Sequence, residues 1–163
     1  MKITEFYKGY SQTEYILEYH DADNFDNLEY DKCKQSYGIC FYNGLLVIGF
    51  GGKKKTWGPI GGTIEKGETY EETLIREVKE ESNMKVLSYK PIGYQKVIDV
   101  KENSFIYQLR YACIVEPFGP FISDPAMGVS EIKLINPNEY KKYFDWRQIG
   151  DRLIDRARGI MKV

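Results

Sequence analysis

The sequence predicts an α+β protein, in which a mixed β-sheet carries helices on its faces. Segments typical of β-strands come both before and after a single central helix, and a second amphipathic helix closes the chain. With elements in this order, each helix is expected to bury its apolar stripe against the sheet. The chain has 163 residues, the length of one domain, and we expect residues 1–163 to form a single domain.

The predicted strands are rich in aromatic and β-branched residues and are separated by turn or loop residues. In chain order they cover residues 14–20, 37–42, 45–50, 57–60, 92–100, 104–115 and 131–135. Asn43-Gly44 joins the second and third of them, and this dipeptide is the strongest short signal of a β-hairpin. Along 104–115 every second residue from Phe105 to Val115 is apolar, so these side chains share one face.

Two helices are expected, at residues 69–82 and 146–160, and Asn136-Pro137 opens a further short helix. The closing helix has one apolar stripe, formed by Trp146, Ile149, Leu153, Ala157 and Ile160. In the central helix we expect Leu74, Ile75 and Val78 to anchor the helix to the sheet.

Composition and charge exclude several classes of function. Hydrophobic residues make up 42% of the chain and charged residues 29%, which is ordinary for a globular protein. The 23 basic and 24 acidic side chains nearly balance, so no net basic field draws the protein onto nucleic acid or an anionic membrane. No apolar run has the length of a membrane span, and the first residues (MKITEFYKGYSQTEY) lack the apolar stretch of a secretory signal.

Cys33, Cys40 and Cys113 are odd in number and show no CxxC spacing. They argue against a disulfide framework and a thiolate zinc site, and they suit a reducing cytoplasm. A cysteine nucleophile is not expected, because His20 is the only histidine and reads as an ordinary surface residue.

The central helix concentrates acidic residues in an otherwise neutral chain. Seven glutamates lie between Glu65 and Glu81, opposed only by Lys66, Arg76 and Lys79. Like charges at helical spacing repel one another, and a bound multivalent cation would remove that repulsion. By charge alone, a solvated helix face explains the run equally well.

Helical spacing selects three of these carboxylates. Glu77, Glu80 and Glu81 share one face beside the buried stripe, whereas Glu71 and Glu72 are expected to face solvent. Carboxylate oxygens are hard ligands, so the site predicts Mg²⁺ or Mn²⁺.

Arg76 and three glycines support the cation site. An ion pair between Arg76 and Glu68 would lock the preceding loop against the helix and orient Glu77. The backbone at Gly61, Gly62 and Gly67 could approach a metal or a phosphate closely.

These offsets resemble the Nudix box, Gly-x5-Glu-x7-Arg-Glu-U-x-Glu-Glu-x-Gly-U, where U is a bulky aliphatic residue. Six of its seven specified polar or glycine positions match, with the box running from Gly62 to Met84: Gly62, Glu68, Arg76, Glu77, Glu80 and Glu81. The resemblance implies an α/β/α sandwich with the box helix and the closing helix on opposite faces of the sheet.

Two positions depart from the family pattern. Asn83 stands in place of the final glycine, which normally has positive φ, and asparagine is the next most tolerant residue there. Pro59 lies one residue earlier than the usual proline, ahead of Ile60, which bears on the turn at Gly61.

The resemblance implies metal-dependent hydrolysis of a phosphoanhydride bond in a nucleoside diphosphate linked to another group. Glu77, Glu80, Glu81 and the Gly61 carbonyl would hold Mg²⁺ or Mn²⁺. Glu77 and Glu80, braced by Arg76 and Glu68, would be catalytic. Some family members instead place the base on a later loop, and there the candidates are Glu116, Asp124 and Glu131.

The resemblance implies a small nucleotide as substrate, such as a nucleoside triphosphate, a nucleotide sugar or a similar compound. Ile98 and Asp99 occupy the place where ADP-ribose hydrolases have a proline, and the signatures of dinucleoside polyphosphate and coenzyme A hydrolases are not present. Expected substrate contacts come from the lysines at 53–55, Lys55 above all, and from Trp57 and Glu131. The alternative is a Nudix-like module that binds a nucleotide without cleaving it. Many relatives are dimers, which makes a homodimer compatible with the resemblance.

Overall fold

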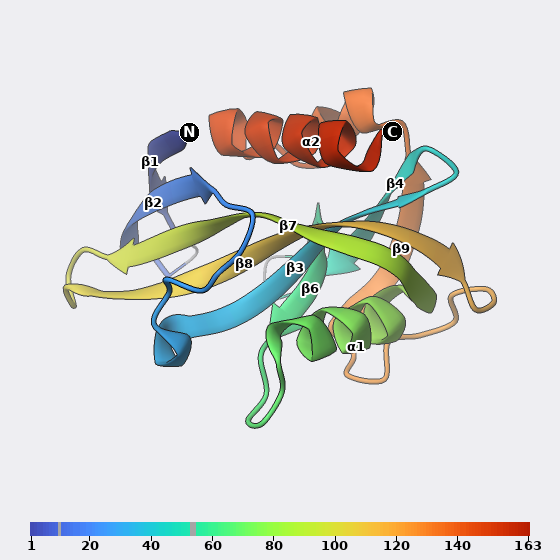
Figure 1. Cartoon of the computed structure of the whole chain (residues 1–163), viewed down its shortest axis with the longest axis horizontal. Coiled ribbons are helices and arrows are strands. Elements are labelled where there is room, and N and C mark those ends of the chain that lie inside the picture. Colours follow the sequence, from blue (N-terminus) through green and yellow to red (C-terminus); the bar gives the residue numbers. More distant parts are fainter. Residues whose placement is uncertain (10, 53–54) are drawn as a thin grey trace.

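In the computed structural model, which describes residues 1–9, 11–52 and 55–163, one β-sheet lies between two helices (Figure 1). The strands are β1 (Lys2–Lys8), β2 (Glu14–Asp21), β3 (Cys33–Tyr42), β4 (Leu45–Gly51), β5 (Thr56–Gly58), β6 (Ile60–Thr63), β7 (Met84–Asp99), β8 (Ser104–Pro117) and β9 (Val129–Ile135). The helices are α1 (Tyr70–Ser82) and α2 (Arg147–Met161), with short 3-10 helices η1 (Tyr30–Lys32) and η2 (Pro137–Lys142).

The sheet is mixed, as the sequence predicts. The order of its strands is β1-β2-β7-β8-β3-β4-β5, with β6 paired to β3 and β9 paired to β4. Among the described strands, β3 and β8 run parallel, and the other neighbouring pairs are antiparallel. This parallel pair lies near the centre of the sheet, and it joins a strand that precedes α1 in the chain to a strand that follows α1.

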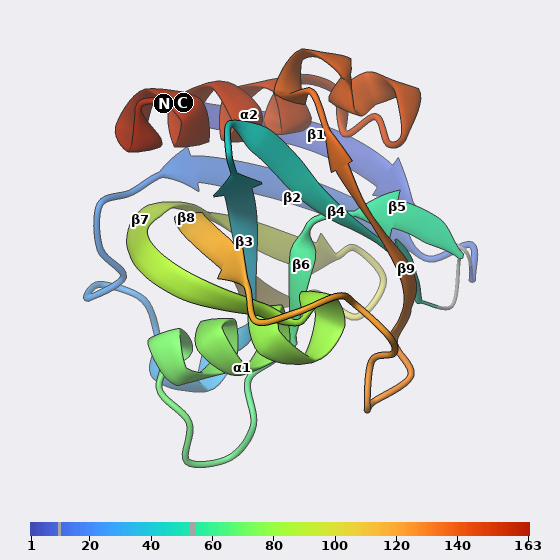
Figure 2. The same cartoon turned by 90° about the vertical axis from the view of Figure 1, so that its right-hand side faces the viewer.

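The two helices cover opposite faces of the sheet (Figures 1 and 2). On the face of α2, the helix residues Ile149, Leu153 and Ala157 are buried against Tyr19 and Phe41 of the sheet. The face of α1 has its own core, in which Leu74 and Val78 are buried with residues of β3, β4, β6 and β8. This layering confirms the predicted α+β sandwich.

Local chemistry explains where α1 begins and ends. Thr69 caps its first turn, because the Thr69 hydroxyl accepts a hydrogen bond from the Glu72 N–H at 3.1 Å. Asn83 ends it in the left-handed conformation (φ 53°, ψ 41°), and its N–H donates to the Lys79 carbonyl. The sequence predicted that asparagine is tolerated at this left-handed position and that a helix precedes it.

The segment predicted as one strand at 57–60 is two strands that pair with different partners. β5 pairs with β4, and β6 pairs with β3, with Pro59 between them. Proline has no N–H to donate to a ladder, so the break falls there. At Gly61 an added Cβ would lie 2.5 Å from the Tyr37 Cα, so only glycine lets β6 approach β3 this closely.

Several sequence expectations need correction. β1 was not expected, β7 starts at Met84 directly after α1 rather than at residue 92, and β3 starts at Cys33 rather than at residue 37. Ile75 does not anchor α1, because it is 46% exposed on the side of the helix that faces away from the sheet. His20 is half-buried and stacks on Tyr94 with ring centroids 5.0 Å apart.

Cys33, Cys40 and Cys113 are free and buried. Among the described helices, none combines the length and the apolar character needed to cross a membrane.

Candidate active site

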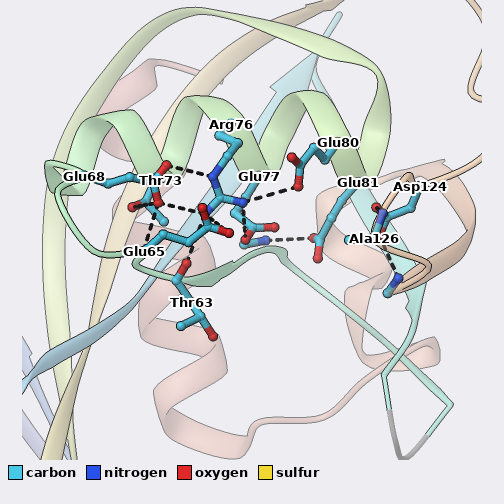
Figure 3. Close-up of polar contacts among 12 residues, drawn as sticks. Thr63, Glu65, Glu68, Thr73, Arg76, Glu77, Glu80, Glu81, Asp124 and Ala126 are labelled. Carbon is cyan, nitrogen blue, oxygen red and sulfur yellow. Dashed lines mark hydrogen bonds and ion pairs between the residues drawn. The ribbon is translucent and has the colours of Figure 1, made fainter.

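Arg76 joins α1 to the loop that precedes it (Figure 3). Its guanidinium bonds Glu68 in a bidentate pair, with Nε 2.7 Å from Oε2 and Nη2 2.9 Å from Oε1. Nη1 donates to Glu77 Oε1 at 2.9 Å and to Glu80 Oε2 at 3.3 Å, and Nη2 also donates to the Thr63 carbonyl at 3.1 Å. The expected Arg76–Glu68 pair is therefore present, and the same arginine orients two further carboxylates.

Glu68 is held as a charged brace. Its Oε1 also accepts hydrogen bonds from the Glu65 N–H at 2.9 Å and from the Thr73 hydroxyl at 3.1 Å. The hydrogen bonds from Arg76, with those from Glu65 and Thr73, lower the pKa of Glu68 to about 2. A carboxylate this firmly ionised positions its neighbours and is a poor proton acceptor.

Glu81 lies deeper in the site than Glu68. Its Oε2 accepts a hydrogen bond from the Gly61 N–H at 3.0 Å, which links α1 to β6. Burial raises the pKa of Glu81 to about 8, and the negative charges of Glu77, Asp124 and Glu80 add to this. Burial likewise raises the pKa of Glu77, although Arg76 opposes the shift.

Two glycines let the backbone close around these carboxylates. A Cβ at Gly62 would lie 2.5 Å from Glu77 Oε1, and one at Gly128 would lie 3.8 Å from Glu81 Oε1 and 3.1 Å from Asp124 Oδ2. The carboxylates thus lie between β6 and the loop that leads into β9, as Figure 3 shows for Glu81 and Asp124.

The donor set suits a hard divalent cation. Glu77, Glu80 and Glu81 present oxygen atoms from one helix face next to the Gly61 backbone, and a cation there would relieve the repulsion that raises the pKa of Glu81. Within the described part of the chain, no three histidine, cysteine or acidic side chains are close enough together to hold a metal ion. The reason is visible in the contacts, since Arg76 bonds Glu77 and Glu80 while the Gly61 N–H bonds Glu81.

Of the three bases considered on later loops, only Asp124 lies near the box carboxylates. Its charge acts on both Glu77 and Glu81. Both of its oxygens are occupied by backbone N–H groups, with Oδ1 2.8 Å from the nitrogen of residue 126 and Oδ2 2.9 Å from those of 128 and 129. Glu116 and Glu131 are exposed on β8 and β9, opposite Lys85 and Phe50.

A family model described as the NUDIX domain matches residues 40–157, which is most of the chain. The chain belongs to the Nudix family. The match includes the whole Nudix box and the predicted family is thereby confirmed.

Solved structures of Nudix proteins share the fold. A mutant of the Bacillus subtilis pyrophosphohydrolase BsRppH superposes with TM-score 0.71 at 20% identity, covering 96% of this chain and 97% of that chain. A Nudix hydrolase from Nitrosomonas europaea gives 0.65 at 14%, with 78% and 90% covered. The Nudix domain of Shewanella oneidensis NrtR, in complex with ADP ribose, gives 0.62 at 15%, with 83% and 94% covered. No curated protein matches the chain.

The predicted substrate contacts are not gathered at the Nudix box. Lys53 and Lys54 lie outside the described residues, and Lys55 is exposed. Trp57 packs against Phe50 and Tyr143 with ring centroids 5.3 and 5.9 Å away, as part of the core on the α2 side. Trp57 therefore has a packing role in the structure, and Glu131 is an exposed residue of an outer strand.

Arg110 is a buried charged residue that the sequence reasoning missed. It lies on β8 and is only 3% exposed, with its guanidinium 4.8 Å from the ring centre of Tyr37 and 5.8 Å from that of Trp146. Nη2 donates to Gln108 at 2.8 Å, but Nε and Nη1 have no partner among the described residues. Burial lowers the pKa of Arg110 to about 10. The available signal was the alternation of β8, which sets Gln108 and Arg110 on the face opposite the apolar residues.

Glu71 also differs from expectation. It is half-buried, and its Oε1 accepts a hydrogen bond from the Tyr111 hydroxyl at 3.1 Å. The buried tyrosine needs a partner for its hydroxyl, and α1 supplies one. Glu72 is exposed, as predicted.

Proposed function

We propose that this Nudix protein hydrolyses a phosphoanhydride bond in a nucleoside diphosphate linked to another group, using Mg²⁺ or Mn²⁺. The observation that carries the proposal is the set of three carboxylates on one face of α1, Glu77, Glu80 and Glu81, of which Glu77 and Glu81 lie against the glycine backbone of β6. Family membership and the likeness to a pyrophosphohydrolase and to an ADP-ribose complex support it.

The side chains divide into ligands and supports. Glu77, Glu80, Glu81 and the Gly61 carbonyl would hold the divalent ion, which when bound neutralises phosphate charge and lowers the pKa of a bound water. Arg76 keeps Glu77 and Glu80 pointing to one place, and Glu68 keeps Arg76 in position. The Gly61 N–H does the same for Glu81.

Glu80 is the better-placed proton acceptor for the attacking water. Its side chain is 31% exposed and it shares only a long 3.3 Å bond with Arg76. Glu77 is 12% exposed and fixed between Arg76 and Gly62, an arrangement that suits a metal ligand. Asp124 is the weaker candidate, because backbone N–H groups already occupy both of its oxygens.

The nucleoside part of the substrate is proposed to lie against Tyr37, which Arg110 supports. Tyr37 pairs with Gly61 across β3 and β6. Burial raises the pKa of the Tyr37 hydroxyl, and the negative charges of Glu81 and Glu77 raise it further. The Arg110 guanidinium lies over one face of the Tyr37 ring. Arg110 is buried, so its proposed role is to support the Tyr37 ring from one side, while the half-buried ring offers the nucleobase a stacking surface.

The decisive experiment is a hydrolysis screen over nucleoside triphosphates and nucleotide sugars with Mg²⁺ or Mn²⁺, repeated with Glu77→Gln, Glu80→Gln and Glu81→Gln. Each variant should lower kcat by at least about 10²-fold, the lower range for losing a positioned catalytic group, while the fold remains intact by circular dichroism. Glu77→Gln should weaken metal affinity more than Glu80→Gln, because Glu77 is the more buried and more firmly held of the two carboxylates. Nucleotide binding by calorimetry with no turnover in either metal would replace the enzyme by a binding module.

We also propose a cytoplasmic location. The three free, buried cysteines support it, because a reducing compartment keeps thiols unpaired.

A further inference from the structure

The side chain of Asn83 makes a hydrogen bond to a nearby loop, and a glycine at this position could not make that bond. Its Nδ2 donates to the Pro120 carbonyl at 3.0 Å, across 37 positions of sequence. Its own carbonyl accepts a hydrogen bond from the Phe118 N–H at 3.0 Å. The residue that departs from the Nudix box is thus the residue through which the end of α1 holds the chain beyond β8.

The loop in question, residues 118–128 between β8 and β9, has little apolar contact to hold it. Phe118, Ile122 and Met127 are 57%, 87% and 90% exposed. The Lys79 ammonium lies 5.4 Å from the centre of the Phe118 ring, an exposed contact of modest strength. Phe121 is half-buried, but with three exposed apolar residues beside it, the position of the loop depends strongly on its polar bonds.

Among the described residues, the side-chain hydrogen bonds of the loop's two halves come from Asp124 and Asn83, and a backbone bond from the Gly52 N–H to the Gly128 carbonyl at 3.0 Å adds to them. Asp124 folds the second half by accepting N–H groups of residues 126, 128 and 129. Asn83 ties the first half to α1 through Pro120. The hydrogen bonds of Asp124 stay within the loop and the start of β9. Among the described side-chain hydrogen bonds of the loop, the one from the Asn83 amide connects it to the end of α1.

A pocket of about 500 Å³ separates α1 from the loop, and Asn83 lies on its wall. The helix contributes Arg76, Lys79, Glu80 and Asn83, and the loop contributes Pro120, Ile122, Ser123 and Pro125. The proposed proton acceptor Glu80 therefore faces a space whose width depends on where the loop lies. At the other end of the loop, Gly128 lies against Glu81 and Asp124.

We propose that Asn83 is a positioning residue, whose side-chain amide holds the loop 118–128 against the carboxylate-bearing end of α1. This fixes the width of the pocket beside Glu80 and the placement of Asp124 next to Glu81. The expected effect on turnover rests on the proposed hydrolase function. The hydrogen bond from the Asn83 amide to the loop, which we call the tether, does not depend on that function.

The test compares Asn83→Gly and Asn83→Asp with the control Asn103→Gly. Glycine adopts the left-handed conformation at least as readily as asparagine, so Asn83→Gly removes the amide without straining the backbone. Asn83→Asp keeps the size of the side chain but has no N–H to donate to Pro120. Asn103 has a similar φ of 49° in the β7–β8 hairpin, and therefore reports the effect of the same change away from the site.

Both Asn83 variants should exchange the amide hydrogens of residues 118–128 roughly threefold to tenfold faster, the range of one neutral hydrogen bond. Their kcat/KM for nucleotide hydrolysis should fall by a similar factor, while the melting temperature of Asn83→Gly stays at or above that of the parent. Asn103→Gly should change neither quantity.

Unchanged exchange in Asn83→Gly overturns the proposal, and so does faster exchange with unchanged kcat/KM. If the parent protein hydrolyses no nucleotide, the proposed function fails, and the exchange measurement alone decides the tether. In that case faster exchange in both Asn83 variants supports the tether, and exchange equal to that of Asn103→Gly refutes it.

Discussion

Glu68 and Arg76 form a bidentate ion pair that closes the loop before α1 onto the middle of the helix, with N–O distances of 2.7 and 2.9 Å. The two side chains are only 16% and 23% exposed. Two parallel hydrogen bonds in a fixed orientation, shielded from water, are worth more than an ordinary surface pair. The pair therefore contributes both to stability and to the orientation of the site.

Replacing Glu68 by Gln should make acid stability less pH-dependent. The folded-state pKa of Glu68 is lowered from 4.5 to about 2, so its contribution is fully present above pH 4.5 and is lost as pH falls toward 2. We expect Glu68→Gln to lose roughly 2 kcal/mol of unfolding free energy at pH 7, allowing for partial exposure, and to approach the parent near pH 2. Urea denaturation across this range measures it. A deficit independent of pH would contradict the ion-pair explanation.

Replacing Glu81 by Gln should stabilise the protein while abolishing turnover. The pKa of Glu81 is raised from 4.5 to about 8, so the stability of the protonated form is fully present below pH 4.5 and is lost as pH rises through 8. Above pH 8, Glu81→Gln should therefore unfold with at least about 2 kcal/mol more free energy than the parent. Mg²⁺ should raise the melting temperature of the parent and leave that of Glu81→Gln nearly unchanged. A variant less stable than the parent at pH 9 would show that the buried negative charge of Glu81 does not destabilise the folded protein.

The helix, its Asn83 end and the carboxylate face were predictable from sequence, because their signals are local. The Thr69 cap, the left-handed Asn83 and the spacing of the carboxylates by three and four residues all lie within or next to one helix. The pair between Arg76 and Glu68 was within reach for the same reason, since its members are only eight positions apart.

Contacts between distant segments were not predictable in this way. Asn83 with Pro120 and Glu71 with Tyr111 join residues 37 and 40 positions apart, and no local pattern fixes which strand passes a given helix. Arg110 was missed because a charged residue in a strand normally indicates a solvent-facing side, whereas here both faces of β8 are covered. β1 was missed because its alternating charges become meaningful only once it pairs with β2.

A methyl group at Gly62 should displace the Glu77 carboxylate and little else. The added Cβ would lie 2.5 Å from Glu77 Oε1, which is the far end of a side chain that can move. We expect Gly62→Ala to lower kcat by about 10-fold to 10²-fold, because Glu77 loses its placement, and to cost less than about 1 kcal/mol of stability. The control is Gly58→Ala on β5, where a Cβ meets only the Trp146 ring at 3.8 Å. Equal activity of the two variants would mean that Glu77 tolerates another position.

Replacing Arg110 by Met should separate binding from stability. The change removes a buried guanidinium with two unpartnered N–H sites, together with its hydrogen bond to Gln108 and its contact with the Tyr37 ring. Because an uncompensated buried charge destabilises the fold, we expect the free energy of unfolding to rise by about 1 kcal/mol. The KM for the nucleotide should rise about tenfold, the effect of losing the buried cation–π contact that supports the Tyr37 ring, with kcat nearly unchanged. Arg152→Met is the matched control, because Arg152 is fully paired with Asp21 on the side of α2, and its loss should destabilise the protein without changing KM. If Arg110→Met loses stability and keeps the parent KM, Arg110 is a packing residue and the nucleoside lies elsewhere.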